Sequence, residues 1–330
     1  MGQPGLEIGF RTDTLKHILL YSTGEKGSVP TFSKIVDLAK LRNGKITIVD
    51  VFEQTPSLPQ RLFASDVYEE VKKIAEARIK KRLDRLTAQA QDRGVDATSA
   101  VLFGKPFGEL IRTALIQEHD LIVKTARVGV GLRERLMGST ALHLIRKSPA
   151  PVLVVQPKRR VQFNRILVPL DFRNEDSDEK SINTEIMEKA ISIAELDGSQ
   201  LNFLHVWRPY GVSLLSGGRT RMSQDKIQEY VKTYKTNHKE MFEEFLNRYS
   251  FGHLEHRVYF ERGDPALLIP EVSARRRISL VVIGSTYSTG IGGIFMGSTA
   301  EQVIGQINCS VLTLKPRGFV TPVDVVTSVT

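Results

Sequence analysis

The chain has 330 residues, of which 41% are hydrophobic and 25% are charged, ordinary proportions for a soluble globular protein. No apolar run approaches the roughly 20 residues that a membrane helix needs, and no basic segment with an apolar core resembles a signal peptide. Cys309 is the only cysteine, so no intrachain disulfide can form, which fits a reducing compartment. We expect a cytoplasmic protein of two domains that is not embedded in a membrane.

The net charge of +9 is not shared evenly between the two halves. Residues 1–160 contain 27 lysines and arginines against 17 acidic residues, whereas residues 161–330 contain 19 against 20. A basic surface can attract nucleic acid, anionic lipid or an acidic protein. Much of the excess lies between Lys72 and Arg93, beside an apolar stripe from Val67 to Leu83 at helical spacing, which favours a solvated helix face. No aromatic and basic platform accompanies it, so we expect no specific nucleic-acid binding.

The first half alternates short apolar runs with amphipathic segments. Strands are expected at residues 18–21, 45–52, 98–103, 121–124 and 152–155. Helices are expected at residues 31–41, 66–93, 107–117 and 139–146. Nearly continuous Val, Ile and Leu strands separated by helices indicate a parallel sheet covered on both faces.

The second half repeats this alternation. Strands are expected at residues 166–170, 200–207, 256–260, 280–283 and 311–314. Helices are expected at residues 183–196, 223–248, 266–274 and 299–306. In a parallel sheet of this kind, ligands bind beyond the carboxyl ends of the strands.

The two halves are copies of one domain. The run LMGSTA from Leu136 matches FMGSTA from Phe295, and Gly104-Lys105-Pro106 matches Gly263-Asp264-Pro265 at the same spacing along the chain. A constant offset across separated motifs indicates duplication.

The first strands of the two copies correspond at a shorter offset. HILLYST from His17 matches RILVPLD from Arg165, and the offset then grows through variable segments, as loop insertions would cause. We predict domains at residues 1–157 and 162–316, joined by a short basic linker. The tail at 317–330 could be disordered or could add an edge strand.

A glycine-rich segment between two apolar strands is the clearest functional signal. It runs from Gly284 to Gly297 and is followed by Ser298 and Thr299 at the expected start of a helix. Glycines allow close approach of the backbone to a ligand, and phosphate binds readily at a helix N-terminus. The spacing matches neither the Walker pattern nor GxGxxG.

The segment resembles the Gly-x2-Gly-x9-Gly-Ser nucleotide loop of the universal stress protein family, and the resemblance extends over roughly residues 15–316. It implies an α/β fold of two tandem Rossmann-like (adenine nucleotide alpha hydrolase-like) domains, each a five-stranded parallel sheet flanked by helices. In this family the last strands pair across a dimer axis, so residues 152–155 are expected to pair with 311–314 in an intramolecular pseudo-dimer. A homodimer also remains possible.

The same resemblance implies an adenine-nucleotide site in the second domain. Tyr287 replaces the second glycine of the loop, and Ser288 stands where an arginine is common in the family. The tyrosine could block the phosphates or stack on a ring. The implied binding residues are Pro169, Asp171, Val206, Gly284, Gly297, Ser298 and Thr299.

The first domain departs further from the family pattern and is expected to be a degenerate, mainly structural copy. Thr23 stands in place of the aspartate, and Thr125 and Val128 stand in place of two glycines. Only the stretch 138–140 of the phosphate end remains.

We expect no catalytic residue and no metal site. His253 and His256 lack a third ligand and are interpreted as a surface or strand pair. His205 and Trp207 could touch a ligand but are more often core residues, and Cys309 is expected to be a buried, inert thiol.

The leading hypothesis is a non-enzymatic regulatory module that binds ATP, ADP or AMP in its second domain, with Mg²⁺ only if ATP is bound. An alternative is a nucleotide-independent adaptor for a protein partner, for example a membrane transporter. A slow ATP hydrolase is a third possibility, but no general base with a suitable setting accompanies the loop.

Overall fold

The computed structural model describes residues 15–25, 28–53, 65–127, 137–172, 182–212, 222–285, 287–290 and 293–324. By their contacts the residues form two compact units. Unit 1 comprises Met1–Gln162, Gly284–Gly297 and Asn308–Thr330, and unit 2 comprises Phe163–Ile283 and Ser298–Ile307. The glycine segment and the last strand of the second repeat therefore belong, by their contacts, to unit 1.

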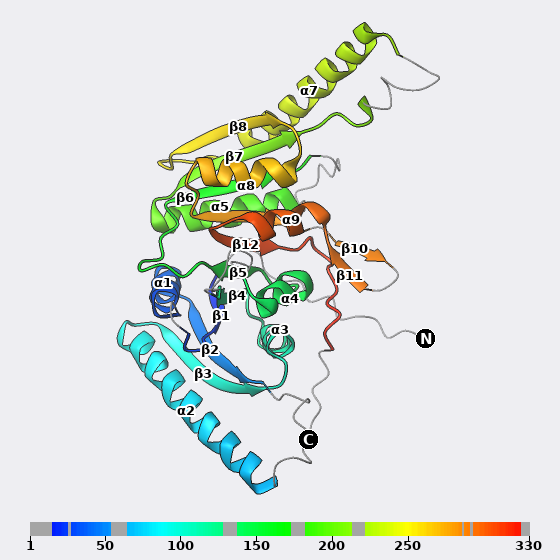
Figure 1. The fold of residues 1–330 in the computed structure, drawn as a ribbon. Coiled ribbons are helices and arrows are strands. Elements are labelled where there is room, and N and C mark those ends of the chain that lie inside the picture. Colours follow the sequence, from blue (N-terminus) through cyan, green and yellow to red (C-terminus); the bar gives the residue numbers. More distant parts are fainter. Residues whose placement is uncertain are drawn as a thin grey trace. The chain divides into compact units, whose positions relative to one another are not determined.

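The first repeat forms the predicted five-stranded parallel sheet (Figure 1). Its strand order is β3-β2-β1-β4-β5, and every neighbouring pair is parallel. The strands are β1 (His17–Tyr21), β2 (Lys45–Phe52), β3 (Asp96–Phe103), β4 (Leu121–Thr125) and β5 (Val152–Val155).

Helices cover this sheet, and all four predicted helices are present. Gly104, at a φ of 137°, lets the chain turn out of β3, and Pro106 then opens the next helix, where its missing N–H costs nothing. The helices are α1 (Ser28–Leu41), α2 (Ser65–Asp92), α3 (Pro106–Ile116) and α4 (Ser139–Lys147).

The apolar stripe predicted along α2 is only partly buried. Leu83 is 1% exposed and Ala75 and Ile79 are half-buried, whereas Val71 is 55% exposed. The stripe is therefore buried toward the end of the helix and exposed near its start, and α2 contacts both β2 and β3. Periodicity identifies the side of a helix that is apolar but not how far the sheet beneath it extends.

The second repeat has the same strand order in unit 2. The order β9-β6-β7-β8 corresponds strand by strand to β4-β1-β2-β3, again with parallel neighbours. The strands are β6 (Arg165–Leu170), β7 (Gln200–Trp207), β8 (His256–Arg262) and β9 (Leu280–Gly284). The helices are α5 (Ile182–Asp197), α7 (Gln224–Asn247), α8 (Pro265–Arg275) and α9 (Ser298–Gln306). The duplicated fold predicted from the constant offset is confirmed.

Backbone conformation repeats together with the topology. Glu118 and Arg277, which occupy equivalent positions of the two repeats, both have left-handed φ values, of 53° and 52°. Gly104 and Gly263 are equivalent at the same spacing and have φ values of 137° and 157°. Non-glycine residues seldom adopt a positive φ, so its recurrence at one position of both repeats reflects a shared turn after the helix.

The last strand of the chain pairs with the last strand of the first repeat. In unit 1, β12 (Ser310–Leu314) lies antiparallel to β5, with Val311 opposite Val154 and Leu312 opposite Leu153. These four side chains are at most 1% exposed. The predicted pairing of residues 152–155 with 311–314 is confirmed, and it joins the end of the second repeat to the core of the first.

The glycine segment contains an element that the sequence analysis did not predict. Strands β10 (Tyr287–Gly290) and β11 (Gly293–Met296) form an antiparallel hairpin, with Tyr287 opposite Met296. The hairpin contacts α4 through β11. Just before it, Ser285 donates its N–H to Leu314 O at 2.8 Å and accepts a hydrogen bond from Lys315 Nζ at 2.9 Å.

The tail, whose structure the sequence left open, forms no strand between residues 317 and 324. Phe319 is 8% exposed, and its ring lies 5.0 Å from Lys315 Nζ. Further along, Asp324 O accepts a hydrogen bond from Arg112 Nε at 2.8 Å. This part of the tail therefore packs on unit 1, and residues 325–330 lie outside the described part of the chain.

Candidate functional site

The carboxyl edge of the sheet in unit 2 carries the first three predicted site residues. Asp171 directly follows β6 and is exposed. Its backbone is held by Asn183 of α5, whose side chain accepts from Asp171 N at 3.2 Å and donates to Asp171 O at 2.7 Å. These two hydrogen bonds fix the main chain of Asp171 at the carboxyl end of β6.

Pro169 and Val206 lie on one face of this edge. Pro169 is in register with Leu204 of the neighbouring strand, so Val206 points to the same side, two residues nearer the edge. Both side chains are half-buried. Together they form a small apolar surface next to the strand end that positions Asp171, as the interpretation of an adenine site requires.

Ser298 and Thr299 open helix α9, as predicted. Ser298 is exposed and Thr299 is half-buried. The first N–H groups of a helix have no intrahelical partner, and the helix dipole adds a partial positive charge there. This end of α9 can therefore accept an anionic group.

The glycines of the predicted loop occupy the ends of regular elements. Gly284 is the last residue of β9, and Gly297 directly precedes α9. Tyr287 opens the hairpin strand β10. The direction of its side chain, and hence its effect on a ligand, lies outside the described part of the structure.

His205 is a hydrogen-bonded core residue. It is 1% exposed, its Nδ1–H donates to Leu170 O at 2.9 Å, and its Nε2 lies 3.0 Å from His238 Nδ1 of α7. The two rings are stacked, and Phe172 packs edge-on against His205. Burial lowers the pKa of His238, and the negative charge of Asp171 offsets part of that effect. The pair therefore links α7 to the sheet through a buried hydrogen bond.

The remaining candidates also serve packing. Trp207 is 5% exposed and stacks on Phe260. Cys309 is a buried thiol, as expected. His256 is exposed and lies against Phe251.

The corresponding edge of the first repeat is filled by charged side chains. Lys124, buried at the end of β4, donates to Thr125 O at 2.9 Å, and burial lowers its pKa. Gly24, just after Thr23, has a left-handed φ of 74°, and a Cβ there would lie 2.8 Å from Arg82 Nη1. Charged side chains at this edge support the interpretation of the first repeat as a mainly structural copy. Val128 lies outside the described residues.

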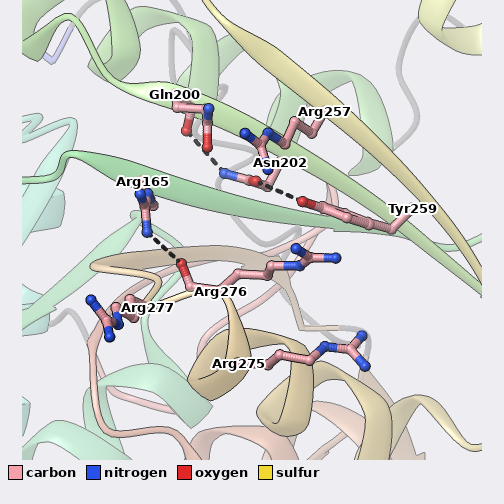
Figure 2. A pocket seen from close by; sticks show the side chains of 8 residues that line it. All are labelled: Arg165, Gln200, Asn202, Arg257, Tyr259, Arg275, Arg276 and Arg277. Atoms are coloured by element: carbon pink, nitrogen blue, oxygen red, sulfur yellow. Dashed lines mark hydrogen bonds between the residues drawn. The ribbon is translucent and has the colours of Figure 1, made fainter.

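A concave site lies at the opposite, amino edge of the unit 2 sheet, and the sequence analysis missed it. A cavity of about 300 Å³ is lined by five arginines together with Gln200, Asn202 and Tyr259 (Figure 2). The triplet Arg275-Arg276-Arg277 was the available signal. It lies in the half of the chain that has almost no net charge, where a composition count conceals it.

A comparison with models of protein families identifies the family to which this fold belongs. The model described as the universal stress protein family matches the chain twice, over residues 14–156 and 162–315. The chain belongs to the universal stress protein family. The resemblance inferred from the glycine segment, and the tandem organisation, are thereby confirmed.

Curated universal stress proteins align with most of the chain. Universal stress protein E of Escherichia coli strain K12 is 28% identical over 226 residues, which cover 68% of this chain and 69% of the relative. The universal stress protein E homolog of Haemophilus influenzae is 29% identical over 199 residues, which cover 60% of this chain and 62% of the relative.

Solved structures show the same fold over almost the whole length. A putative universal stress protein from Pseudomonas aeruginosa UCBPP-PA14 has a TM-score of 0.65 at 17% identity, with 93% of this chain and 95% of that chain covered. A universal stress protein from Archaeoglobus fulgidus has a TM-score of 0.61 at 19% identity, with 91% and 98% covered. Among the described residues, no helix is both long enough and apolar enough to cross a membrane.

Proposed function

We propose that this universal stress protein is a non-enzymatic, cytoplasmic regulatory module whose second domain binds an adenine nucleotide. The observation that carries the proposal is the carboxyl edge of unit 2. There the exposed Asp171 is held by its backbone beside the apolar surface of Pro169 and Val206. The proposed domains are residues 1–157 and 162–316, followed by the tail 317–330.

Each residue of the proposed site has a separate chemical task. The Asp171 carboxylate accepts hydrogen bonds from the adenosine, and Pro169 and Val206 contact the base. The N-terminus of α9, with Ser298 and Thr299, and the backbone at Gly284 and Gly297 receive ribose and phosphate. With ATP, Mg²⁺ would share the phosphate charge. The buried histidines already hydrogen-bond within the core, so they supply no general base for hydrolysis.

Calorimetry with adenosine, AMP and ATP tests this site. The wild type is expected to bind adenosine or AMP at least as well as ATP, because Tyr287 replaces a glycine at the phosphate end of the loop. Tyr287→Gly should raise ATP affinity selectively. Asp171→Ala should weaken every adenine ligand by about tenfold, the loss expected for one hydrogen bond to a carboxylate.

Thr23→Ala, at the equivalent position of the first repeat, is the matched control and should leave the affinity for every adenine ligand unchanged. Tight ATP binding that Tyr287→Gly leaves unaltered would contradict the proposed role of the tyrosine. Loss of adenine affinity in Thr23→Ala as large as in Asp171→Ala would move the site to the first domain.

A nucleotide-independent adaptor is the second candidate. It is favoured by the hairpin β10–β11, which packs on α4 and so gives the glycine segment a structural purpose. If neither the wild type nor Tyr287→Gly binds any adenine ligand, this candidate replaces the first. The partner would then be a protein, for example a membrane transporter, and copies of this chain could also associate as a homodimer.

A further inference from the structure

The arginine-lined cavity is built by the amino ends of three strands and the end of one helix. Arg165, Gln200 and Arg257 come from the starts of β6, β7 and β8. Arg276 and Arg277 follow α8. Because parallel strands start at the edge opposite their carboxyl ends, the cavity lies roughly 20 Å from the proposed nucleotide edge. It is therefore a separate site.

The positive charge in this cavity is mostly uncompensated. Arg275 forms ion pairs with Glu261 at 3.6 Å and with Glu271 at 3.4 Å. Within the described part of the chain, the other four arginines make no ion pair with a carboxylate. Cations near a helix C-terminus are favoured by its dipole, which accounts for residues at the end of α8 but not for those on β6 and β8. Such a cluster concentrates positive potential in the cavity.

Arg276 is the best-positioned donor of the cluster. Its guanidinium lies 4.9 Å from the centre of the Tyr259 ring, and its carbonyl accepts a hydrogen bond from Arg165 Nη1 at 3.1 Å (Figure 2). Its Nε is buried without a hydrogen-bond partner. A buried N–H donor without a hydrogen-bond partner is destabilising. An anion bound beside this guanidinium would offset that cost.

The wall behind Arg276 is fixed by a buried amide. Asn202 is 1% exposed, and its Nδ2 donates to Ile166 O at 3.3 Å. Its Oδ1 accepts from Tyr259 Oη–H at 3.5 Å. This arrangement holds the aromatic ring in place, and the ring in turn positions the guanidinium, so the cavity is largely preformed.

The cluster is not required by the fold. In the first repeat, no arginine occupies any of the five positions that the alignment of the repeats makes equivalent. Those positions hold His17, Thr98, Ile116, Gln117 and Glu118. The shared backbone, including the left-handed turn at Glu118 and Arg277, therefore forms without these charges.

We propose that this cavity binds a small anion bearing phosphate groups, with Arg276 as the central donor and Arg165, Arg257 and Arg277 around it. Guanidinium groups match phosphate oxygens in pairs. A volume of about 300 Å³ suits a compact ligand. The charges line a concavity rather than an extended stripe, which favours a small anion over a nucleic-acid backbone.

Calorimetry of the full chain with inorganic pyrophosphate tests the proposal. The wild type should bind one pyrophosphate per chain, and Arg276→Gln should weaken it by at least about tenfold. Arg248→Gln removes one positive charge from unit 2 outside the cavity and should leave the affinity within about twofold. Circular dichroism should show that both variants remain folded.

Further measurements distinguish this cavity from the proposed nucleotide site and a free phosphate ligand from a lipid headgroup. Ser298→Ala alters the proposed nucleotide edge and should leave pyrophosphate binding unchanged, so failure of one site is distinguishable from failure of the other. Succinate should bind more weakly than pyrophosphate if phosphate geometry is recognised. Binding only to vesicles containing phosphatidic acid would overturn the assignment to a free small anion. Equal losses in Arg276→Gln and Arg248→Gln, or no pyrophosphate binding by the wild type, would also overturn it.

Discussion

In each repeat a buried polar interaction connects the long helix to the sheet, but different residue types form it. In the first repeat, Arg82 of α2 pairs with Asp50 of β2 and donates to Ser22 O at 3.2 Å. In the second, His238 of α7 bonds His205 of β7, which donates to Leu170 O. Asp50 and His205 are both the sixth residue of their strands, and Ser22 and Leu170 coincide when the first strands of the repeats are aligned. The two links are therefore equivalent.

One fold thus tolerates either an ion pair or a neutral pair at the same place. Burial raises the pKa of Asp50 even though Arg82 pairs with it, which shows how costly the desolvation is there. The histidine link contains no such ion pair, and burial lowers the pKa of His238, which favours its neutral form. Duplication has therefore preserved the position of the polar link, whereas the residues that form it have changed.

Removing the cation of the first link should have the largest effect. Arg82→Met leaves the Asp50 carboxylate buried without its partner and should lower the free energy of unfolding by about 3–5 kcal/mol. Urea unfolding followed by circular dichroism measures this loss. Adding Asp50→Asn should recover part of it, because the double variant has no buried charge. A loss below about 1 kcal/mol in Arg82→Met would mean that the pair contributes little.

The amino edges of the two sheets offer a second comparison, in acid sensitivity. His119 is fully buried against His17, with ring centres 3.9 Å apart, and burial lowers the pKa of His119 to about 3. Below about pH 6.5 and down to about 3, the unfolded chain binds a proton there and the folded chain does not. Acidification therefore favours unfolding. The equivalent residue of the second repeat is Ile278.

His119→Ile copies that equivalent residue into the first repeat. Lowering the pH from 6.5 to 5 should reduce the free energy of unfolding of both proteins. The reduction should be about 2 kcal/mol smaller in the variant than in the wild type, because one proton contributes about 1.4 kcal/mol per pH unit. Urea unfolding at the two pH values gives this difference. Asn43→Ala, at an exposed turn, is a control expected to retain the acid sensitivity of the wild type. If the free energy of unfolding depends on pH in the same way in the wild type and in His119→Ile, the acid sensitivity does not arise from His119.

The neutral link of the second repeat should be the least costly to disturb. His238→Leu removes the hydrogen bond between His205 Nε2 and His238 and should cost about 1 kcal/mol at pH 7, the worth of one neutral hydrogen bond. His238→Gln can still donate to His205 and should cost less. Trp207, the only tryptophan, lies in the same unit, and its fluorescence during urea unfolding reports the change. Equal losses in the two variants would assign the effect to packing alone.

The duplicated α/β fold could be predicted from the amino-acid sequence alone. The constant offset between equivalent motifs predicted two copies, and the apolar runs predicted the strands of both sheets close to their observed bounds. This information is local, because a buried parallel strand must be continuously apolar and a covering helix must have one apolar face. The glycine segment likewise indicated the family, because the spacing of its residues is a property of the chain alone.

The contacts between distant elements could not be predicted from the sequence and became visible in the folded chain. The hairpin β10–β11 and its packing on α4, the partial burial of α2 and the pairing of His205 with His238 are absent from any local pattern. The arginine cavity is another case, since its lining comes from four elements between Arg165 and Arg277. Periodicity specifies the state of a segment, whereas a site depends on side chains that meet after distant segments have packed.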